Sequence, residues 1–378
     1  MENLKEIVAR FAVEGNVVDI KPLGNGLIND TYKVSVEGGP RDYVLQRINN
    51  AVFKDVDSLQ SNIEEVTRWI RMKLEAAGEK DIDRKVLRFV PLLSEGQNTE
   101  ALLSDRPKTY YFDGEKYWRV SVFIDRAKTF ETVDQTYSEY AGEAFGSFES
   151  MLADIPAKLG ETIPDFHNME LRLSQLVEAV RNDVAGRLKA DRDTEGKELH
   201  GILEKIDKFG VEMCKAERLH REGALPKRIC HCDTKVNNMM FDENGDFLCV
   251  IDLDTVMPSY VFSDFGDFLR TAANKVAEDS PEIGEVDFDM DIFKAFSRGY
   301  IKGTSKFLLP VERENLPYAA CLFPFMQAVR FFTDYLNGDT YYKISYPEHN
   351  LVRTRNQMRL FESAMSKVPE MKAWIDSL

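Results

Sequence analysis

The sequence predicts an α+β protein of two lobes, in which a small antiparallel β-sheet with one inserted helix precedes a larger, mainly helical lobe. Three observations predict this class. The first part of the chain alternates apolar and polar residues between glycine turns. The rest carries long segments whose apolar residues recur at helical spacing. The length of 378 residues exceeds what one hydrophobic core usually organises, and we place the boundary so that the lobes are 1–123 and 124–378.

The sheet-rich part begins with residues 17–48, whose alternation and two glycine turns are typical of a twisted antiparallel sheet. A helix is expected over residues 55–78, with Asp57 as its N-cap. Apolar residues recur there at helical spacing, namely at Leu59, Ile63, Val66, Ile70 and Leu74. Two more strand-like stretches follow at 85–93 and 108–124, and an Asp-Gly pair in the second predicts a tight hairpin.

The helical part begins near residue 133. Its amphipathic segments predict helices over residues 135–152, 170–184, 197–220, 291–303 and 351–365. A polar stretch at 231–241 and the short strands around it interrupt these helices. Because binding and catalytic groups collect on loops, we expect the functional residues there.

Composition limits the partners of the chain. The net charge of −15 and the isoelectric point near 5.0 argue against nucleic acid and anionic membranes, which attract surfaces rich in lysine and arginine. Five cysteines without a Cys-x-x-Cys pair predict no disulfide framework. Residues 1–11 lack the apolar core of a signal peptide, and the apolar segment 318–332 is interrupted by polar residues and a proline. We therefore expect a soluble, cytoplasmic protein. The sequence gives no indication of its oligomeric state.

The most informative stretch is HCDTKVNNMMF at residues 231–241, followed by FLCVIDLDT at residues 247–255. A phosphoryl-transfer site needs a carboxylate that orients an alcohol and accepts its proton, together with a cation near the transferred group. It also needs oxygen ligands for the Mg²⁺ that bridges the nucleotide phosphates. The candidates are the base Asp233, the cation Lys235 at +2, and the metal ligands Asn238 at +5 and Asp252 at +19.

The spacing of these candidates has a structural explanation. The turn DENGD at 242–246 reverses the chain, so we expect a hairpin to bring Asn238 and Asp252 together. His231 is expected to be structural. Asp264, in the segment SDFGD, is expected to brace the catalytic loop by hydrogen bonds rather than to bind metal.

The pattern H-x-D-x-K-x-x-N followed by I-D-x-D resembles the catalytic and metal loops of protein-kinase-like folds. It takes the form found in the aminoglycoside phosphotransferase and choline kinase superfamily. A strand-rich lobe with one inserted helix, followed by a helical lobe, is the context in which that pattern occurs. The resemblance therefore implies a bilobal protein-kinase-like fold.

Two other interpretations of this stretch are disfavoured. A zinc site would need neighbouring ligands that alternate between the two faces of a strand, namely Cys230, His231, Cys232 and Asp233. A nucleophilic Cys–His pair is disfavoured because Cys230 and Cys232 flank a strand-like run. Cysteine in such a position is more often a small buried apolar residue.

The nucleotide is expected to bind at LGNGLINDTYKV, residues 23–34, which lies between two strand-like segments. Gly24, Asn25 and Gly26 are expected to form a turn there, and the backbone N–H groups of such a turn can fold over ATP phosphates. A purely structural turn is the alternative, because two glycines in a turn are common without a ligand.

The sequence departs from the kinase pattern at the small-lobe lysine, which usually pairs with a glutamate on the inserted helix. The strand YVLQRI offers Gln46 or Arg47 at that place, and alternation puts them on opposite faces. We assign Arg47, paired with Glu64, to the nucleotide site. A solvated arginine and a surface glutamate are the alternative.

Over nearly its whole length the sequence resembles the N-acetylhexosamine 1-kinases, which are anomeric sugar kinases. The segments that carry the resemblance are GLINDTYKV, CDTKVNN, VIDLDTVMP, DFGD, VRFFTDYLNGD and YPEHNLVRTRNQ, in that order. The resemblance implies that ATP and Mg²⁺ are used to phosphorylate the anomeric hydroxyl of N-acetylglucosamine or N-acetylgalactosamine. It also implies that Asp233 faces this hydroxyl and that the sugar contacts Thr255, Arg330 and Tyr341.

Alternatives remain for the sugar ligands and for the function. A buried Arg330 needs acceptors, which sugar hydroxyls or an ion pair with Asp334 can supply. Tyr341 can stack on a sugar or simply pack. The same chemistry on an aminoglycoside, choline or another hexose is the first rival function, although Arg330 favours a neutral, hydroxyl-rich acceptor. The second rival is a nucleotide-binding pseudokinase, because the small-lobe lysine is missing.

Overall fold

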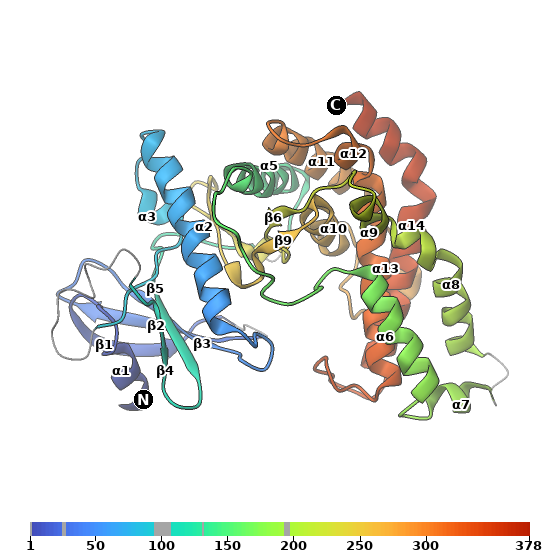
Figure 1. Ribbon diagram of the computed structural model, residues 1–378, viewed down its shortest axis with the longest axis horizontal. Coiled ribbons are helices and arrows are strands. Elements are labelled where there is room, and N and C mark those ends of the chain that lie inside the picture. Colours follow the sequence, from blue (N-terminus) through green and yellow to red (C-terminus); the bar gives the residue numbers. More distant parts are fainter. Residues whose placement is uncertain (1, 25–27, 94–106, 131, 193–196) are drawn as a thin grey trace. The chain divides into compact units, whose positions relative to one another are not determined.

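The computed structural model confirms the predicted class, with an antiparallel sheet part and a larger helical part (Figure 1). It describes residues 2–24, 28–93, 107–130, 132–192 and 197–378. The chain forms two compact units. The first comprises residues 1–129, 154–164 and 238–257, and the second comprises residues 130–153, 165–237 and 258–378. Two later segments of the chain therefore belong to the same unit as the sheet.

The first unit contains a five-stranded antiparallel sheet with the strand order β1-β2-β3-β5-β4. The strands are β1 Asn16–Pro22, β2 Asp30–Glu37, β3 Tyr43–Ile48, β4 Tyr110–Phe112 and β5 Tyr117–Val122. The predicted Asp-Gly hairpin connects β4 to β5. Its Asp113 carboxylate accepts hydrogen bonds from the amides of Glu115 and Lys116, at 2.9 and 2.8 Å. The side chain therefore closes the turn as an Asx turn does.

Alternation along the strands gives the sheet two chemically different faces. Leu45 and Val120 lie opposite each other in the buried core, which helix α1 (Glu2–Val8) also joins. Their neighbours Gln46 and Arg119 are also paired across the strands, and they project from the other face. One face of the sheet is therefore apolar, and the other presents polar side chains.

Helix α2 (Val56–Ala76) is the predicted inserted helix, and the short helix α3 (Ile82–Lys85) follows it. The N-cap of α2 is Asp55, whose carboxylate accepts a hydrogen bond from the Ser58 amide at 2.9 Å. The prediction of Asp57 as the cap was wrong by two positions. Two aspartates near the helix start both suit capping, so only the backbone geometry distinguishes them.

The later segments of the first unit form a hairpin of strands β7 (Met239–Phe241) and β8 (Phe247–Val250). The 3₁₀ turn η1 (Val236–Asn238) precedes the hairpin, and the 3₁₀ turn η2 (Leu253–Thr255) follows it. The hairpin starts in the polar stretch that the sequence singles out. It therefore carries the predicted metal ligands within the unit that holds the sheet.

The second unit is helical (Figure 1). Its helices are α5 Gln135–Leu152, α6 Met169–Asn182, α7 Arg187–Arg192, α8 Glu198–Met213, α9 Lys215–Arg221, α10 Val261–Ala272, α11 Met290–Thr304, α12 Pro310–Glu314, α13 Leu316–Leu336 and α14 His349–Ser377, with the 3₁₀ turn η3 Ile283–Glu285. Its short strands are β6 Arg228–Cys230 and the last two residues of β9 Met257–Ser259. Among the described residues, no helix combines the length and apolarity that crossing a bilayer requires.

Helices α5 and α11 approach each other closely because each helix contributes a glycine to their contact. A Cβ atom at Gly142 would lie 2.1 Å from the carbonyl oxygen of Phe296. One at Gly299 would lie 2.0 Å from the carbonyl oxygen of Glu139. Both distances are far below van der Waals contact, so only glycine permits this approach.

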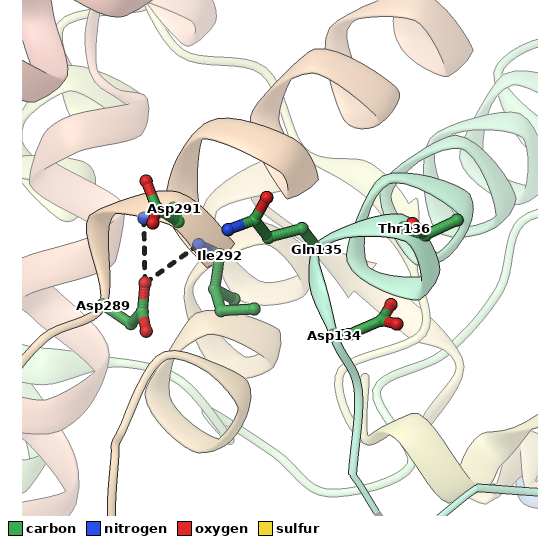
Figure 2. A pocket seen from close by; sticks show the side chains of 6 residues that line it. All are labelled: Asp134, Gln135, Thr136, Asp289, Asp291 and Ile292. Carbon is green, nitrogen blue, oxygen red and sulfur yellow. Dashed lines mark hydrogen bonds between the residues drawn. The ribbon is translucent and has the colours of Figure 1, made fainter.

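A pocket lies at the N-terminal ends of α5 and α11 (Figure 2). Two of its aspartates, Asp134 and Asp289, act as helix caps. Asp134 accepts a hydrogen bond from the Tyr137 amide at 2.9 Å, and Asp289 accepts bonds from the Asp291 and Ile292 amides at 2.9 and 3.2 Å. These carboxylates therefore stabilise helix starts, as anionic N-caps do.

Candidate active site

The predicted catalytic loop follows β6, and two aspartates of helix α10 hold it in place. The Asp264 carboxylate accepts hydrogen bonds from the amides of His231 and Cys232, at 2.8 and 2.7 Å. The Asp267 carboxylate accepts a bond from the Thr234 amide at 3.1 Å, and the Thr234 hydroxyl donates to the Asp264 carbonyl at 2.8 Å. Cys232 has a φ of 63°, which is unusual for a residue with a side chain. These four hydrogen bonds fix that turn of the backbone.

His231 lies inside the protein beneath this loop. Its imidazole is buried between Phe145 and Phe148, whose rings contact it edge to face at centroid distances of 5.7 and 5.9 Å. The Nδ1 atom of the imidazole accepts a hydrogen bond from the amide of Asp233 at 3.3 Å. The contacts of His231 are therefore those of a residue that shapes the loop.

Asp233 and Lys235 lie together. The Nζ atom of Lys235 is 2.7 Å from Oδ1 of Asp233, and the two side chains are 43% and 21% exposed. Burial disfavours the ammonium charge, but Asp233 and Asp267 outweigh this effect and raise the pKa of Lys235. Lys235 is therefore a charged group at neutral pH beside a solvent-accessible carboxylate.

The predicted metal ligands lie at one end of the β7–β8 hairpin, in the first unit. Met239 pairs with Val250, and the Ile251 amide donates to the carbonyl oxygen of Asn238 at 2.8 Å. Asp252 follows directly with a φ of 58°. The hairpin therefore brings Asn238 and Asp252 to the same end, although they are 14 positions apart. Amide and carboxylate oxygens are ligands that Mg²⁺ prefers, so this donor set fits the metal.

The predicted phosphate-binding turn connects β1 to β2. Gly24 has a φ of 71°, a conformation that L side chains rarely adopt. Asn25 and Gly26 lie outside the described residues. Just after the turn, the Asn29 amide group donates to Oδ2 of Asp254 at 2.6 Å. Asn29, directly before β2, is therefore tied to the segment that follows the predicted metal ligands.

The prediction that Arg47 pairs with Glu64 was wrong about the partner of Arg47. The Arg47 guanidinium forms an ion pair with Asp30 on the neighbouring strand. Glu64, on α2, accepts a hydrogen bond from the Thr109 hydroxyl. Alternation does put Gln46 and Arg47 on opposite faces, but Gln46 projects from the polar face with Arg119. A cation in the adjacent strand, rather than in β3, therefore occupies the polar face.

That cation is Arg119 of β5, which is absent from the site residues predicted from the sequence. Its Nη2 atom lies 2.6 Å from Oδ1 of Asp254, and the two side chains are 3% and 4% exposed. Its Nε donates to Oε1 of Gln46 at 3.0 Å. The sequence held a signal for it, because an arginine within the apolar strand YWRVSV needs a partner if it is buried.

In the second unit, Arg330 of α13 lies among aromatic side chains. Its guanidinium is 5.5 Å from the ring centroid of Phe166 and 5.6 Å from that of Tyr342. It also donates to Oε1 of Gln327 at 3.1 Å. We call this group of side chains the Arg330 cluster. It consists of Phe166, His167, Arg172, Gln327, Arg330 and Tyr342. Thr255, another predicted sugar ligand, is buried in the first unit.

Asp334 serves a turn of the backbone. Its carboxylate accepts hydrogen bonds from the amides of Thr340, Tyr341 and Tyr342, at 2.9, 2.8 and 2.9 Å. The alternative pairing of Arg330 with Asp334 was therefore wrong. The Tyr341 side chain is 64% exposed and contacts the Tyr342 ring edge-on at 4.8 Å. Tyr341 thus borders the Arg330 cluster, and Tyr342 is the tyrosine within it.

The two other basic residues of the cluster have perturbed pKa values. Burial lowers the pKa of His167 well below its usual value, Arg330 and Arg172 lower it further, and Asp233 opposes them. Burial and the charge of Arg330 lower the pKa of Arg172 to about 10. Within the described residues, His167 Nδ1 and Arg172 Nε are buried without hydrogen-bond partners. Buried polar atoms are usually satisfied, so the cluster has hydrogen-bonding capacity left for a ligand.

Comparisons with known proteins agree with this architecture. The sequence profile of the Phosphotransferase enzyme family matches residues 19–300. A solved aminoglycoside phosphotransferase from Alicyclobacillus acidocaldarius covers 99% of this chain and 96% of its own, with 12% identity and a TM-score of 0.61. A spectinomycin phosphotransferase in complex with ADP and spectinomycin covers 100% and 98%, with 12% identity and a TM-score of 0.53. Choline kinase from Cryptosporidium parvum covers 95% and 92%, with 14% identity and a TM-score of 0.53.

Proposed function

Because the chain belongs to the phosphotransferase enzyme family, we propose that it is a kinase that uses ATP and Mg²⁺ to phosphorylate the anomeric hydroxyl of N-acetylhexosamines. The acceptors are N-acetylglucosamine and N-acetylgalactosamine, and the product is the sugar 1-phosphate. One observation carries the choice of acceptor, namely the cationic and aromatic Arg330 cluster in the unit that holds the catalytic loop. The ADP in a similar solved structure supports the choice of nucleotide.

The loop residues suit this reaction. Asp233 orients the acceptor hydroxyl and takes its proton as the oxygen bonds to the γ-phosphorus and the bond to the leaving ADP oxygen breaks. An anomeric hydroxyl is more acidic than an ordinary alcohol, so orientation matters more than basicity. The ammonium group of Lys235 adds positive charge beside Asp233. Asn238 and Asp252 would hold Mg²⁺, which neutralises charge on the nucleotide phosphates.

The charge of the Arg330 cluster supports a neutral acceptor. Arg330 is close enough to Arg172 for its charge to lower the pKa of that residue. Choline or an aminoglycoside would bring a further positive charge to this place, and like charges in a binding site oppose binding. A neutral sugar instead supplies hydroxyl oxygens to guanidinium N–H groups and an apolar face to Phe166 or Tyr342.

ADP formation with a panel of acceptors tests the proposal. The purified chain is incubated with ATP, Mg²⁺ and one acceptor at a time: N-acetylglucosamine, N-acetylgalactosamine, glucose, choline or an aminoglycoside. We expect ADP with the N-acetylhexosamines and a product whose phosphorus NMR signal couples to the anomeric proton. ADP formed only with choline or only with the aminoglycoside would show that this compound, and not the N-acetylhexosamine, is the acceptor. Nucleotide binding without ADP formation from any acceptor would favour the pseudokinase.

A further inference from the structure

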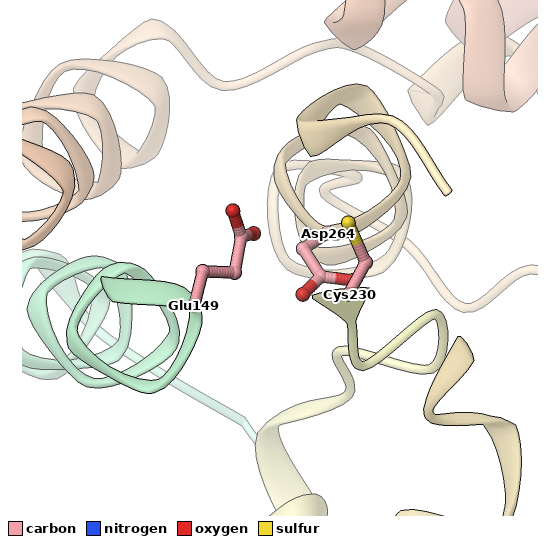
Figure 3. A group of neighbouring side chains, drawn as sticks. All are labelled: Glu149, Cys230 and Asp264. Atoms are coloured by element: carbon pink, nitrogen blue, oxygen red, sulfur yellow. The ribbon is translucent and has the colours of Figure 1, made fainter. Parts of the chain in front are cut away.

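A buried pair of carboxyl groups lies directly behind the catalytic loop. Glu149 of α5 and Asp264 of α10 are 1% and 0% exposed. A carboxylate oxygen of each and the sulfur of Cys230 lie within 4.8 Å of one another. In Figure 3 the Glu149 side chain extends from its helix toward Cys230 and Asp264. Two carboxylates so close together and so deeply buried cannot both be ionised without a large cost.

The partners of the two carboxyl groups differ. Asp264 accepts the two backbone N–H bonds of the catalytic loop, and such bonds favour its charged form. Oε1 of Glu149 accepts a hydrogen bond from the Tyr300 hydroxyl at 2.7 Å, whereas its Oε2 accepts none within the described residues. The groups that act most strongly on Glu149 are Asp264, Tyr300 and Glu312, and none of them is a cation. Glu312 is itself paired with Arg228 at 2.9 Å.

A proton explains this cluster better than a metal ion does. Glu149, Cys230 and Asp264 could each offer one ligand atom. Burial, however, raises the pKa of the Cys230 thiol well above its usual value, and metals bind the thiolate form. The Cys230 thiol also contacts the Arg228 carbonyl oxygen at 3.8 Å. Each Asp264 oxygen accepts one loop amide and keeps a lone pair, which a protonated carboxyl group can use as an acceptor.

We propose that Glu149 is a positioning residue: its carboxyl group carries a proton, donates it in a hydrogen bond to the Asp264 carboxylate, and so fixes the backbone that presents Asp233. The inference rests on the proposed function, since it assigns Asp233 as the reacting carboxylate. Three elements then converge on the loop. Tyr300 of α11 orients Glu149 of α5, Glu149 donates to Asp264 of α10, and Asp264 accepts the loop amides.

The pKa directions agree with this assignment. Burial raises the pKa of Glu149 well above its usual value, and the charge of Asp264 raises it further. Burial also raises the pKa of Asp264, but His231 and the loop amides oppose that rise, which favours the proton on Glu149. The folded state keeps this proton, whereas the unfolded state releases it above the usual glutamate pKa. The folded state therefore loses stability as the pH rises above that value. The expected pH dependence therefore has a definite sign.

Two neutral substitutions of similar size distinguish a positioning role of Glu149 from a packing role. Glu149→Gln keeps a donor for Asp264 and an acceptor for Tyr300, whereas Glu149→Met fills the same space without either. We expect Glu149→Gln to keep kcat near the wild-type value and Glu149→Met to lower it about 10- to 100-fold, with the KM for ATP nearly unchanged. Glu143→Gln is the matched control on α5, because Glu143 lies at the surface paired with Lys302. Equal kcat values for Glu149→Gln and Glu149→Met would overturn the proposal.

A second measurement needs no acceptor and so separates this inference from the proposed function. The denaturation midpoints of wild type and Glu149→Gln are compared from about pH 5 to pH 8, where only the wild type can lose the buried proton on unfolding. We expect the midpoint of Glu149→Gln to rise relative to that of the wild type as pH increases. A constant difference would show that Glu149 carries no extra proton and would overturn the proposal, whatever the acceptor assay gives.

Discussion

Asp233 is the residue on which the proposed chemistry depends most directly. Its side chain is partly exposed, paired with Lys235, and anchored through its own amide to His231. Replacing Asp233 by Asn keeps the shape but removes the proton acceptor and the charge that orients the hydroxyl. We expect turnover to fall at least about 100-fold, as for loss of a general base, while ATP affinity stays within a small factor.

The measurement combines ADP release with calorimetric titration of ATP. Asp246→Asn is the control, because Asp246 is an exposed carboxylate in the turn of the β7–β8 hairpin. Turnover of Asp233→Asn near the wild-type rate would contradict its assignment as the reacting carboxylate. A large loss of ATP affinity would contradict it as well, by showing that the residue serves the nucleotide.

Substitution of Arg330 tests the acceptor site rather than the site of the phosphoryl donor. We expect Arg330→Met to raise the KM for the sugar about 10- to 100-fold, since a charged hydrogen bond contributes about 1.5–3 kcal/mol. The KM for ATP should change little. Arg298→Met is a suitable control, because Arg298 also lies over an aromatic ring, Trp374 at 5.2 Å, but belongs to α11 and pairs with Glu139.

Steady-state kinetics with each substrate varied in turn decides this point. An unchanged KM for the sugar in Arg330→Met would remove Arg330 from the acceptor site. An equal effect in Arg298→Met would show that the change reflects general destabilisation.

Helices and strands were predicted unevenly, and the differences have physical reasons. The alternation in β3 and the Asp-Gly hairpin before β5 are local signals, and both were read correctly. Arg119 and Glu149 were missed because each has its role through a partner far along the chain, namely Asp254 and Asp264. Local periodicity shows that such a side chain points inward, but it does not show which distant group it meets.

The glycines between α5 and α11 offer a test of helix packing. We expect Gly299→Ala to lower the free energy of unfolding by about 1–3 kcal/mol, because the new methyl group collides with the backbone of α5. Gly201→Ala in α8 is the matched control, since a Cβ atom there meets nothing within 4 Å. That control should gain about 1 kcal/mol from helix propensity. Equal urea midpoints for the two variants would contradict the close approach of the helices.

The three chain segments of the first unit explain why parts of the site could be named in advance and their connections could not. The sequence places candidates at Gly24, Asn238 and Asp252, and it predicts the hairpin that joins the last two. It does not show that the segment after Asp252 returns to the sheet, where Asp254 meets Arg119. Pairing between segments more than 100 positions apart is a property of the folded unit, and composition or spacing alone does not reveal it.

The Arg119–Asp254 pair therefore tests the integrity of the first unit. We expect Arg119→Met to lower the free energy of unfolding by about 3–5 kcal/mol, because it leaves the buried Asp254 carboxylate without its cation. Adding Asp254→Asn removes that charge and keeps an acceptor for Asn29, so the double variant should recover much of the loss. Denaturation of both single variants and the double variant gives the coupling, and strictly additive losses would show that the pair contributes none. The exposed pair Arg298–Glu139 is the control, for which the same cycle should give less than about 1 kcal/mol.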